Sequence, residues 1–294
     1  MLSVIIPTFE RRALLEKCLT SVFLQRGAGE FEMIVVDDGS TDGTADYLRG
    51  REKAGELRVV HHKQNRGPAA ARNSGVAIAR GEILAFIDDD CAAAPDWLAE
   101  LARPFEAPEI LAAFGAIIYK EENASVEYDE CIIDNPEARK SMGGNFAIRR
   151  EIFERLNGFD ESLYTFEDVD LSLRVWSAGR VASASLARVY HAEFRWTPET
   201  LDRWVARARV WPTLLKRHDF SIDQNYRLKR YWIFLEPRDW LAIGKYLLRA
   251  PLNLLRLRRQ SGARAQFELR WLKTLVRRRL SVWRGGWQAR TLVI

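Results

Sequence analysis

Hydrophobic residues in the first part of the chain follow two different spacings. Short apolar runs of the kind found in buried strands occur at residues 2–6, 32–36, 57–60 and 85–87. Residues 69–79 are rich in alanine, which favours a helix. A second helix is predicted between the first two runs, where apolar residues recur three and four positions apart: Leu14, Leu15, Cys18, Leu19, Val22 and Phe23. This alternation of strand and helix predicts right-handed βαβ units and an α/β fold with a mostly parallel sheet flanked by helices.

Acidic residues follow two of these predicted strands at the point where each strand ends. The run 32–36 leads into Asp37 and Asp38, and the run 85–87 leads into Asp88, Asp89 and Asp90. Ligands of parallel sheets bind outside the carboxyl ends of the strands, so we expect these acids to meet in one crevice. Adjacent carboxylates repel one another unless a cation offsets them, and Mg²⁺ or Mn²⁺ is the natural choice beside phosphate. A solvated acidic loop remains the alternative.

A third polar region lies past the midpoint of the chain. It combines a glycine-rich stretch at 143–150 with an acidic segment at 166–174. We expect Glu167 and Asp168 to open a helix that runs to about Ala178 and ends at Gly179. These two carboxylates suit either of two roles, capping the helix or acting as a general base in a cleft.

Composition sets limits on the class of protein. With 294 residues and 47% hydrophobic content, the chain can bury a sizeable core in one main domain, with room for a smaller second region. Its three cysteines are widely spaced, which indicates neither a disulfide framework nor a zinc site and favours a reducing cytoplasm. No secretory signal pattern and no run of about 18 apolar residues is present. A Gly-x-Gly-x-x-Gly motif is also missing, which excludes a typical dinucleotide-dependent dehydrogenase.

Positive charge is concentrated near the C-terminus. Between Arg249 and Arg290 there are 12 Lys or Arg residues and one acid, although the whole chain carries only +5. From about Phe267 the pattern predicts a basic amphipathic helix, and tryptophan occurs at positions 271, 283 and 287. Such a helix suits an anionic membrane surface, but it can equally pack on the main domain or on a second subunit as a homodimer. No nucleic-acid motif accompanies the charge, so we expect no nucleic-acid partner.

Six motifs in order resemble glycosyltransferase family 2. They are the runs 4–9, 34–42, 65–67 with 71–73, 86–90, 144–145 and 167–171. Members of that family are inverting, nucleotide-sugar-dependent transferases with the GT-A fold. The resemblance covers about residues 1–195, with a nucleotide-binding half at 1–95 and an acceptor half at 96–195. Residues 196–294 remain as a helical C-terminal region, basic and amphipathic from about 249.

The resemblance also implies roles for individual residues. Asp168 matches the catalytic base, and Glu167 is expected to orient the acceptor. Asp90, Asp88 and His191 are the candidate metal contacts, although His191 also suits a purely structural role. The candidate donor-binding set is Pro7, Thr8, Phe9, Glu10, Asp37, Asp38, Arg66, Arg72, Asp88, Gly144 and Asn145. Within it, Asp38 is expected to bind the base edge and Arg72 to reach phosphate, while Asp89 has no assigned role.

The implied activity is a metal-dependent transfer of a hexose-type sugar in polysaccharide, glycolipid or cell-envelope glycan synthesis. The implied cofactors are Mn²⁺ or Mg²⁺ and a nucleotide sugar, most commonly a UDP-sugar. The partner would be a glycan or a lipid-linked acceptor, and the location cytoplasmic, with peripheral attachment to the inner membrane face as an option. Two alternatives remain, a non-catalytic membrane-associated scaffold and a sugar-phosphate nucleotidyltransferase. A nucleotidyltransferase would need a glycine-rich phosphate loop just after the first strand, but this chain has Pro7 to Glu10 there.

Overall fold

A computed structural model describes residues 1–119, 131–132, 144–192, 198–210, 213–214, 217–218, 277, 280, 281 and 284. The chain divides into two compact units, residues 1–195 and 196–294. Within the predicted acceptor half, residues 120–130 and 133–143 lie outside the described residues. The same holds for most of the basic helix expected from Phe267, including its three tryptophans.

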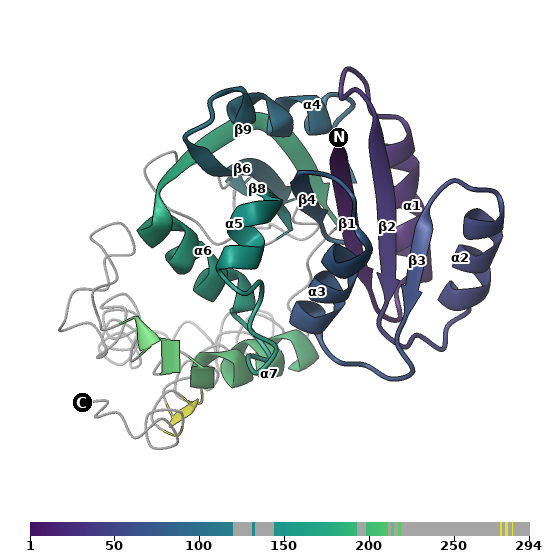
Figure 1. Cartoon of the computed structure of the whole chain (residues 1–294). Helices are drawn as coiled ribbons and strands as arrows, with labels where there is room; N and C mark the ends of the chain where they lie inside the picture. The colour runs from purple at the N-terminus through teal and green to yellow at the C-terminus, as the bar shows by residue number, and fades with distance from the viewer. Residues whose placement is uncertain are drawn as a thin grey trace, which may run out of the picture. The chain divides into compact units, whose positions relative to one another are not determined.

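The N-terminal half of unit 1 has the predicted alternation of strands and helices (Figure 1). In chain order the elements are β1 (Leu2–Thr8), α1 (Arg12–Phe23), β2 (Phe31–Asp37), α2 (Thr44–Lys53), β3 (Arg58–His61), α3 (Pro68–Ile78) and β4 (Ile83–Ile87). The strands pair in parallel in the order β3-β2-β1-β4. Their carboxyl ends therefore lie along one edge, where the acidic residues begin.

The second half of unit 1 extends this sheet with strands of both directions. Its elements are β5 (Cys91–Ala93), α4 (Trp97–Ala102), the 3₁₀ turn η1 (Arg103–Glu106), β6 (Ile110–Tyr119), β7 (Cys131–Ile132), β8 (Asn145–Arg149), α5 (Arg150–Arg155), α6 (Glu167–Ala178) and β9 (Arg180–His191). The sheet continues from β4 as β8-β6-β9-β5, with β7 paired to β6. The α/β fold is confirmed, but parallel pairing is confined to β3-β2-β1-β4 and to β6 with β9, so the sheet is mixed.

The antiparallel strand β8 matters for the site. Because β8 runs opposite to β4, its first residue Asn145 pairs with Ile87, the last residue of β4. Gly144 therefore lies beside Asp88, which follows β4 directly. Behind this edge, Phe86 of β4 stacks on Phe146 of β8 with ring centroids 4.6 Å apart, and Phe159 packs against both rings edge-on. This aromatic core fixes the register of the two strands that carry the site.

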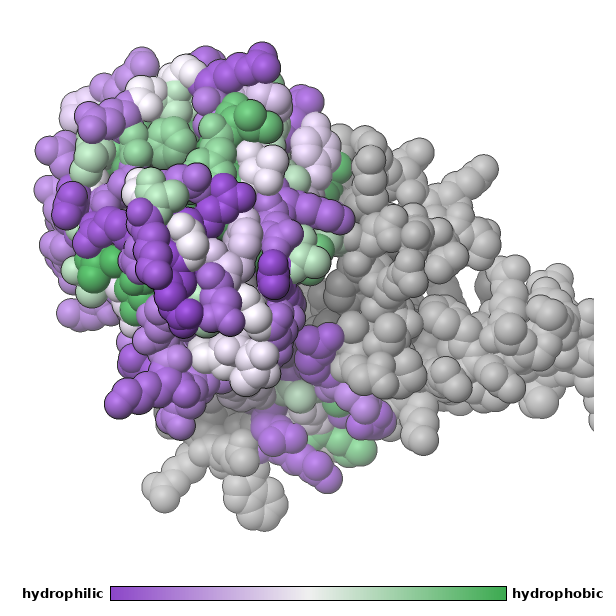
Figure 2. All heavy atoms as spheres, turned by 90° about the vertical axis from the view of Figure 1, so that its right-hand side faces the viewer, coloured by the Kyte–Doolittle hydropathy of each residue, from purple (hydrophilic) through white to green (hydrophobic). Residues whose placement is uncertain are grey.

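The surfaces of the two units carry mostly polar residues where they are described. Figure 2 shows that the face seen from the α2 and β3 side is mainly hydrophilic, with smaller hydrophobic areas between. In unit 2, α7 (Pro198–Arg207) runs into the 3₁₀ turn η2 (Ala208–Val210). Within the described part of the chain, no helix has the length and apolar character needed to cross a membrane.

Candidate active site

Two arginines supply counter-charge to the acidic triplet that follows β4. Arg11 Nη1 lies 3.0 Å from Asp89 Oδ1 and 2.7 Å from Asp90 Oδ2. Arg72 Nη2 lies 2.7 Å from Asp88 Oδ1. The repulsion expected among three adjacent carboxylates is therefore offset by side chains from the β1–α1 connection and from α3.

The middle acid, Asp89, has a structural role that its position in the sequence did not indicate. It is 3% exposed, accepts a 2.7 Å hydrogen bond from the Thr8 hydroxyl, and pairs with Arg11. Burial raises the pKa of Asp89 to about 6, against the opposing effects of Arg11 and Thr8. Asp89 thus anchors Arg11 beside Asp90 and joins the ends of β1 and β4.

Arg72 connects the acidic triplet to the start of α6. Its guanidinium is buried and also donates to Glu167 Oε1 at 2.8 Å, so it bridges Asp88 and Glu167. Burial lowers the pKa of Arg72, but the two carboxylates outweigh this effect and raise it. Burial raises the pKa of Glu167, and Arg72 opposes that shift. A role for Arg72 in orienting these carboxylates fits its contacts better than the expected contact with donor phosphate, because both terminal nitrogens already bind carboxylates.

The helix predicted after residue 166 is confirmed. α6 begins at Glu167 and ends at Ala178, with Gly179 following, and Asp170 pairs with Arg174 at 2.6 Å. The residue before it, Phe166, has φ of 61°, a left-handed conformation that non-glycine residues rarely adopt. Asp168 is half-buried and accepts a hydrogen bond from the Val169 N–H at 2.9 Å. Strained backbone of this kind occurs often at functional sites, where it aims a neighbouring side chain.

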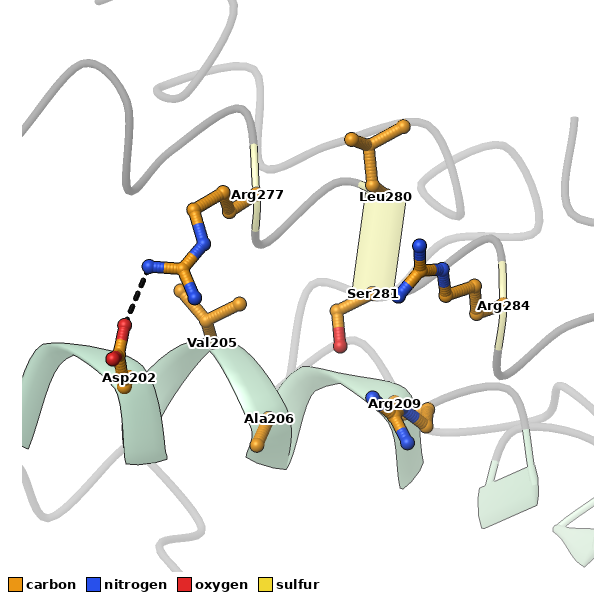
Figure 3. A pocket seen from close by; sticks show the side chains of 8 residues that line it. All are labelled: Asp202, Val205, Ala206, Arg209, Arg277, Leu280, Ser281 and Arg284. Carbon is orange, nitrogen blue, oxygen red and sulfur yellow. Dashed lines mark hydrogen bonds and ion pairs between the residues drawn. The ribbon is translucent and has the colours of Figure 1, made fainter. Parts of the chain in front are cut away.

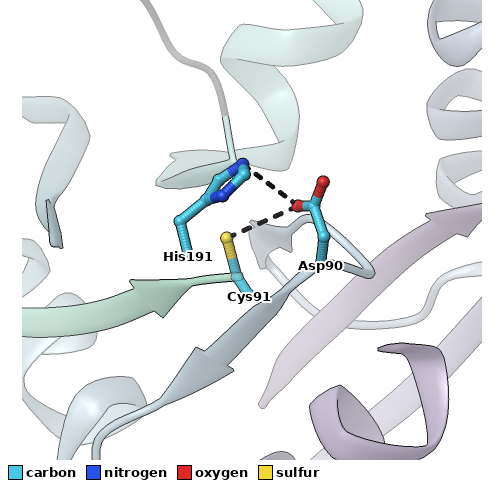
Figure 4. A group of neighbouring side chains, drawn as sticks. All are labelled: Asp90, Cys91 and His191. Carbon is cyan, nitrogen blue, oxygen red and sulfur yellow. Dashed lines mark hydrogen bonds and ion pairs between the residues drawn. The ribbon is translucent and has the colours of Figure 1, made fainter. Parts of the chain in front are cut away.

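A group able to hold a metal lies at the other end of the triplet. Figure 4 shows Asp90, Cys91 and His191 turned toward one another, with ligand atoms all within 4.8 Å of each other. His191 Nε2 lies 3.5 Å from Asp90 Oδ1, while Nδ1 lies 2.6 Å from the carbonyl oxygen of Ala192. A ring that donates from Nδ1 to a carbonyl presents Nε2 as an acceptor, which is the usual arrangement of a metal-binding histidine.

The chemistry of these atoms fits a hard divalent ion only in part. Burial raises the pKa of the Cys91 thiol, with Asp88 and Asp90 adding to the effect, so the thiol is protonated and is a poor ligand for Mg²⁺ or Mn²⁺. The Asp90 carboxylate and His191 Nε2 fit such an ion, with water and phosphate oxygens needed to complete the shell. Asp88 is 31% exposed at its side chain and shares its carboxylate with Arg72.

Gly144 and Asn145 differ from each other in role. A Cβ on Gly144 would lie 2.7 Å from Asp88 Oδ2, and the residue has φ of +67°, so glycine is required there on both counts. Asn145 is 2% exposed, and its amide binds Trp97 Nε1, the Ala116 carbonyl and the Ala187 carbonyl. The side-chain polar atoms of Asn145 therefore bind the interior of unit 1, and a contact between Asn145 and the donor stays a prediction.

The predicted base pocket is a set of loops held together by carboxylates. Asp38, 3% exposed, accepts from the N–H groups of Arg66 and Gly67 and lies 2.6 Å from His62 Nδ1. Asp37 is likewise buried and accepts from the Ser40 N–H. Both acids therefore order the loops after β2 and β3.

The remaining predicted donor contacts lie at the same edge. Glu10 has φ of 53° and accepts from the N–H and hydroxyl of Thr41, which joins the loops after β1 and β2. Arg66 is exposed and pairs with Glu161 at 3.0 Å. Phe9 is 41% exposed, and Pro7 is half-buried within β1.

Two site residues were not predicted from the sequence. Arg11 lies directly after the first motif. A positively charged residue so close to the end of a predicted strand could have been recognised as a counter-charge for the three acids. His62 contacts Asp38 through Nδ1 and the Ser74 hydroxyl through Nε2, at 2.9 Å. No local sequence pattern identifies His62, because its partners belong to other segments: Asp38 follows β2, and Ser74 lies on α3.

The family model of glycosyl transferase family 2 matches residues 3–159, which is more than half of the chain. The chain belongs to this family. The glycosyltransferase AglE of Haloferax volcanii is 29% identical over 189 residues, which cover 60% of this chain and 62% of AglE. This family 2 chain spans 31% to 62% of the length of the first curated relatives that it matches.

Solved structures agree with the GT-A fold expected for the family. A mannosyltransferase from Pyrobaculum calidifontis, PcManGT in complex with GDP-Man and Mn²⁺, superposes with a TM-score of 0.68 at 20% identity. The match covers 98% of this chain and 87% of that one. GalNAc-T7 with UDP, GalNAc and Mn²⁺ gives a TM-score of 0.55 at 21% identity, covering 72% of this family 2 chain and 48% of the other.

Proposed function

We propose that this protein transfers a sugar from a nucleotide-diphosphate donor to an acceptor hydroxyl, with inversion at the anomeric carbon. In this reaction the Asp168 carboxylate takes the proton from the acceptor hydroxyl as its oxygen attacks the anomeric carbon. The bond to the diphosphate breaks in the same displacement. A single displacement needs no covalent nucleophile, and it inverts the configuration.

The observation that carries the proposal is the bridge that Arg72 makes between Asp88 and Glu167. It holds the start of α6, and with it Asp168, beside the carboxyl end of β4. This arrangement supports a base for the acceptor and an acidic site for the donor at one edge of the sheet. Asp168 is only half-buried, which leaves its carboxylate accessible to an acceptor.

Metal dependence is part of the proposal, with Asp90 and His191 as the residues that would hold the ion. A bound Mn²⁺ or Mg²⁺ supplies positive charge that stabilises the departing diphosphate. Nδ1 of His191 donates to the Ala192 carbonyl, so in a neutral ring the Nε2 lone pair, 3.5 Å from Asp90 Oδ1, would be left to bind the ion beside that carboxylate. Arg11 lies at the same carboxylate and is the protein's own cation there.

The donor and acceptor are proposed by class. The proposed donor is a UDP-sugar, although the fold neighbours named above were solved with GDP-Man and with UDP. Asp38 retains acceptor capacity for a ring N–H, which uracil and guanine both present. The proposed acceptor is a glycan or a lipid-linked sugar of polysaccharide or cell-envelope synthesis. The relative TuaG of Bacillus subtilis carries the description of a glycosyltransferase of teichuronic acid biosynthesis, which belongs to this class.

The test is donor hydrolysis and transfer by the purified protein across a panel of nucleotide sugars, with and without Mn²⁺. We expect metal-dependent release of nucleotide from one donor, abolished in Asp90→Asn. Asp168→Asn should retain donor and metal binding but lose transfer. Asp46→Asn, at a carboxylate 79% exposed on α2, is the matched control and should keep full activity.

The outcomes separate the candidate functions. NMR of the product gives its anomeric configuration, and retention would contradict the proposed single displacement. If no nucleotide sugar binds or turns over, the scaffold interpretation replaces the proposal. Release of pyrophosphate from a nucleoside triphosphate and sugar phosphate would instead indicate a nucleotidyltransferase.

A further inference from the structure

A basic cavity lies within unit 2, between α7 and a helical segment near the C-terminus. It has a volume of about 230 Å³ and is lined by Asp202, Val205, Ala206, Arg209, Arg277, Leu280, Ser281 and Arg284. Residues 277, 280, 281 and 284 are helical, and their three- and four-residue spacing puts them on one helix face. Figure 3 shows this segment opposite α7 and η2, with the side chains of Arg277 and Ser281 directed toward α7.

The lining carries three arginines and one carboxylate. Arg277 Nη1 pairs with Asp202 Oδ1 at 2.5 Å, which neutralises one positive charge. Arg209 and Arg284 are both exposed, and among the described residues neither has a carboxylate partner. The cavity therefore has a net charge of +2 available to a ligand.

Ser281 provides a second, independent observation. It is 5% exposed, yet its hydroxyl has no hydrogen-bond partner among the described residues. An unsatisfied buried hydroxyl is destabilising, so its presence at the wall of a basic cavity points to a ligand that accepts a hydrogen bond.

We propose that this cavity binds a phosphate group, held by Arg209, Arg284 and the Ser281 hydroxyl. A phosphomonoester carries a charge of about −1.5 to −2 at neutral pH and three acceptor oxygens, which matches two unpaired guanidinium groups and one hydroxyl. The volume is below the roughly 300–1,000 Å³ typical of pockets for drug-sized ligands, as suits a small charged group. The phosphate comes either from a soluble phosphorylated compound or from an anionic lipid headgroup. All the residues that line the cavity belong to unit 2, and the proposal does not depend on the proposed transferase activity.

The soluble arm measures binding of inorganic phosphate and pyrophosphate to the full chain by calorimetry in EDTA. We expect Arg209→Ala and Arg284→Ala each to weaken binding by about tenfold or more, the usual effect of losing a charged hydrogen bond. Arg203→Ala is the matched control, because Arg203 is exposed on α7, next in sequence to Asp202, but does not line the cavity. Asp90→Asn should bind phosphate as the wild type does, which separates this site from the donor site.

Ser281→Ala distinguishes a binding role from a structural one. Removing an unpartnered buried hydroxyl leaves the melting temperature of the free protein unchanged or raises it. The affinity of Ser281→Ala for phosphate should nevertheless fall, and phosphate should raise the melting temperature of this variant by less than it raises that of the wild type. A lower melting temperature without any change in affinity would overturn the proposed contact.

The lipid arm uses phosphatidylcholine vesicles that contain either phosphatidic acid, a phosphomonoester, or phosphatidylglycerol, a phosphodiester. Preference for phosphatidic acid that is lost in Arg284→Ala identifies a headgroup as the source. Binding of soluble phosphate with no such preference identifies a soluble ligand. The proposal is wrong if neither arm gives binding, or if Arg203→Ala weakens binding as much as Arg284→Ala, since that pattern reflects diffuse charge.

Discussion

Arg11 Nη1 lies 2.7 Å from Asp90 Oδ2, on the carboxylate that we propose for the metal. The same nitrogen lies 3.0 Å from the buried Asp89, which holds the guanidinium at this position. Burial lowers the pKa of Arg11, but Asp89 and Asp90 outweigh it and raise it. The Arg11 guanidinium is therefore a cation of the protein itself that binds the same carboxylate, Asp90, as the proposed metal ion.

Removal of Arg11 is expected to strengthen metal binding in the absence of nucleotide. Arg11→Met takes away both the competitor for Asp90 and one positive charge, so Mn²⁺ affinity should rise several-fold. Electron paramagnetic resonance titration of Mn²⁺ measures this directly. Arg12→Met is the matched control, because Arg12 pairs with Glu16 on the exposed face of α1. Equal or weaker Mn²⁺ binding by Arg11→Met would contradict the shared-ligand arrangement.

Replacement of Arg72 is expected to be strongly destabilising. Arg72→Ala leaves Asp88 and the buried Glu167 without their common partner, and breaking a buried ion pair costs about 3–5 kcal/mol. Urea unfolding provides the measurement. Arg66→Ala is the comparison, since its pair with Glu161 is about half exposed and such pairs contribute at most about 1 kcal/mol. Similar losses in the two variants would show that Arg72 is not the central connection.

The buried Asp89 predicts a specific pH dependence of stability. Its pKa rises from 3.8 to about 6 on folding, so its contribution to the unfolding free energy is complete below 3.8 and is lost as the pH rises through about 6. At about 1.4 kcal/mol per pKa unit, the loss is about 3 kcal/mol. Asp89→Asn lacks this ionisation, so the stability of the wild type relative to this variant should fall over that range. Denaturant titrations in EDTA test it, and parallel stability curves would refute it.

Substitution of Gly144 is expected to disturb Asp88 without unfolding the chain. In Gly144→Ala the new methyl group would meet Asp88 Oδ2 at 2.7 Å, in addition to the backbone strain of φ +67°. Gly55→Ala carries similar strain at φ +72° but has no atom within 4 Å of its added Cβ, so it isolates the backbone effect. Both variants should lose stability, Gly144→Ala the more of the two because of the added contact, and only Gly144→Ala should lose nucleotide-sugar turnover. Normal nucleotide-sugar turnover by Gly144→Ala would show that Asp88 is not part of the site.

The buried cysteines Cys18 and Cys91 are expected to be unreactive in the native protein. Cys18 and Cys91 are at most 2% exposed, and burial raises the pKa of each thiol, so little thiolate is present. In a Cys131→Ser background, a disulfide reagent should modify neither cysteine until denaturant is added. Fast modification of the native variant would show that the edge beside Asp90 opens readily.

The sequence by itself determined many of the elements and the edge of the sheet at which the acidic residues lie. Apolar runs and helical patterning predict β1 to β4, α1 and α3, and the limits of α6 follow from Glu167 at its start and Gly179 after its end. These predictions hold because strand and helix periodicity are local properties of neighbouring residues. The acids after β2 and β4 lie at one edge because parallel strands end together.

Only the tertiary structure decided which charges meet. Arg11 and Asp89 are 78 residues apart, and Arg72 and Glu167 are 95 apart, so no local spacing links them. The antiparallel strand β8 turned Asn145 into a core residue and brought Gly144 against Asp88. Long-range strand order sets these contacts, and burial then requires each charge to find a partner.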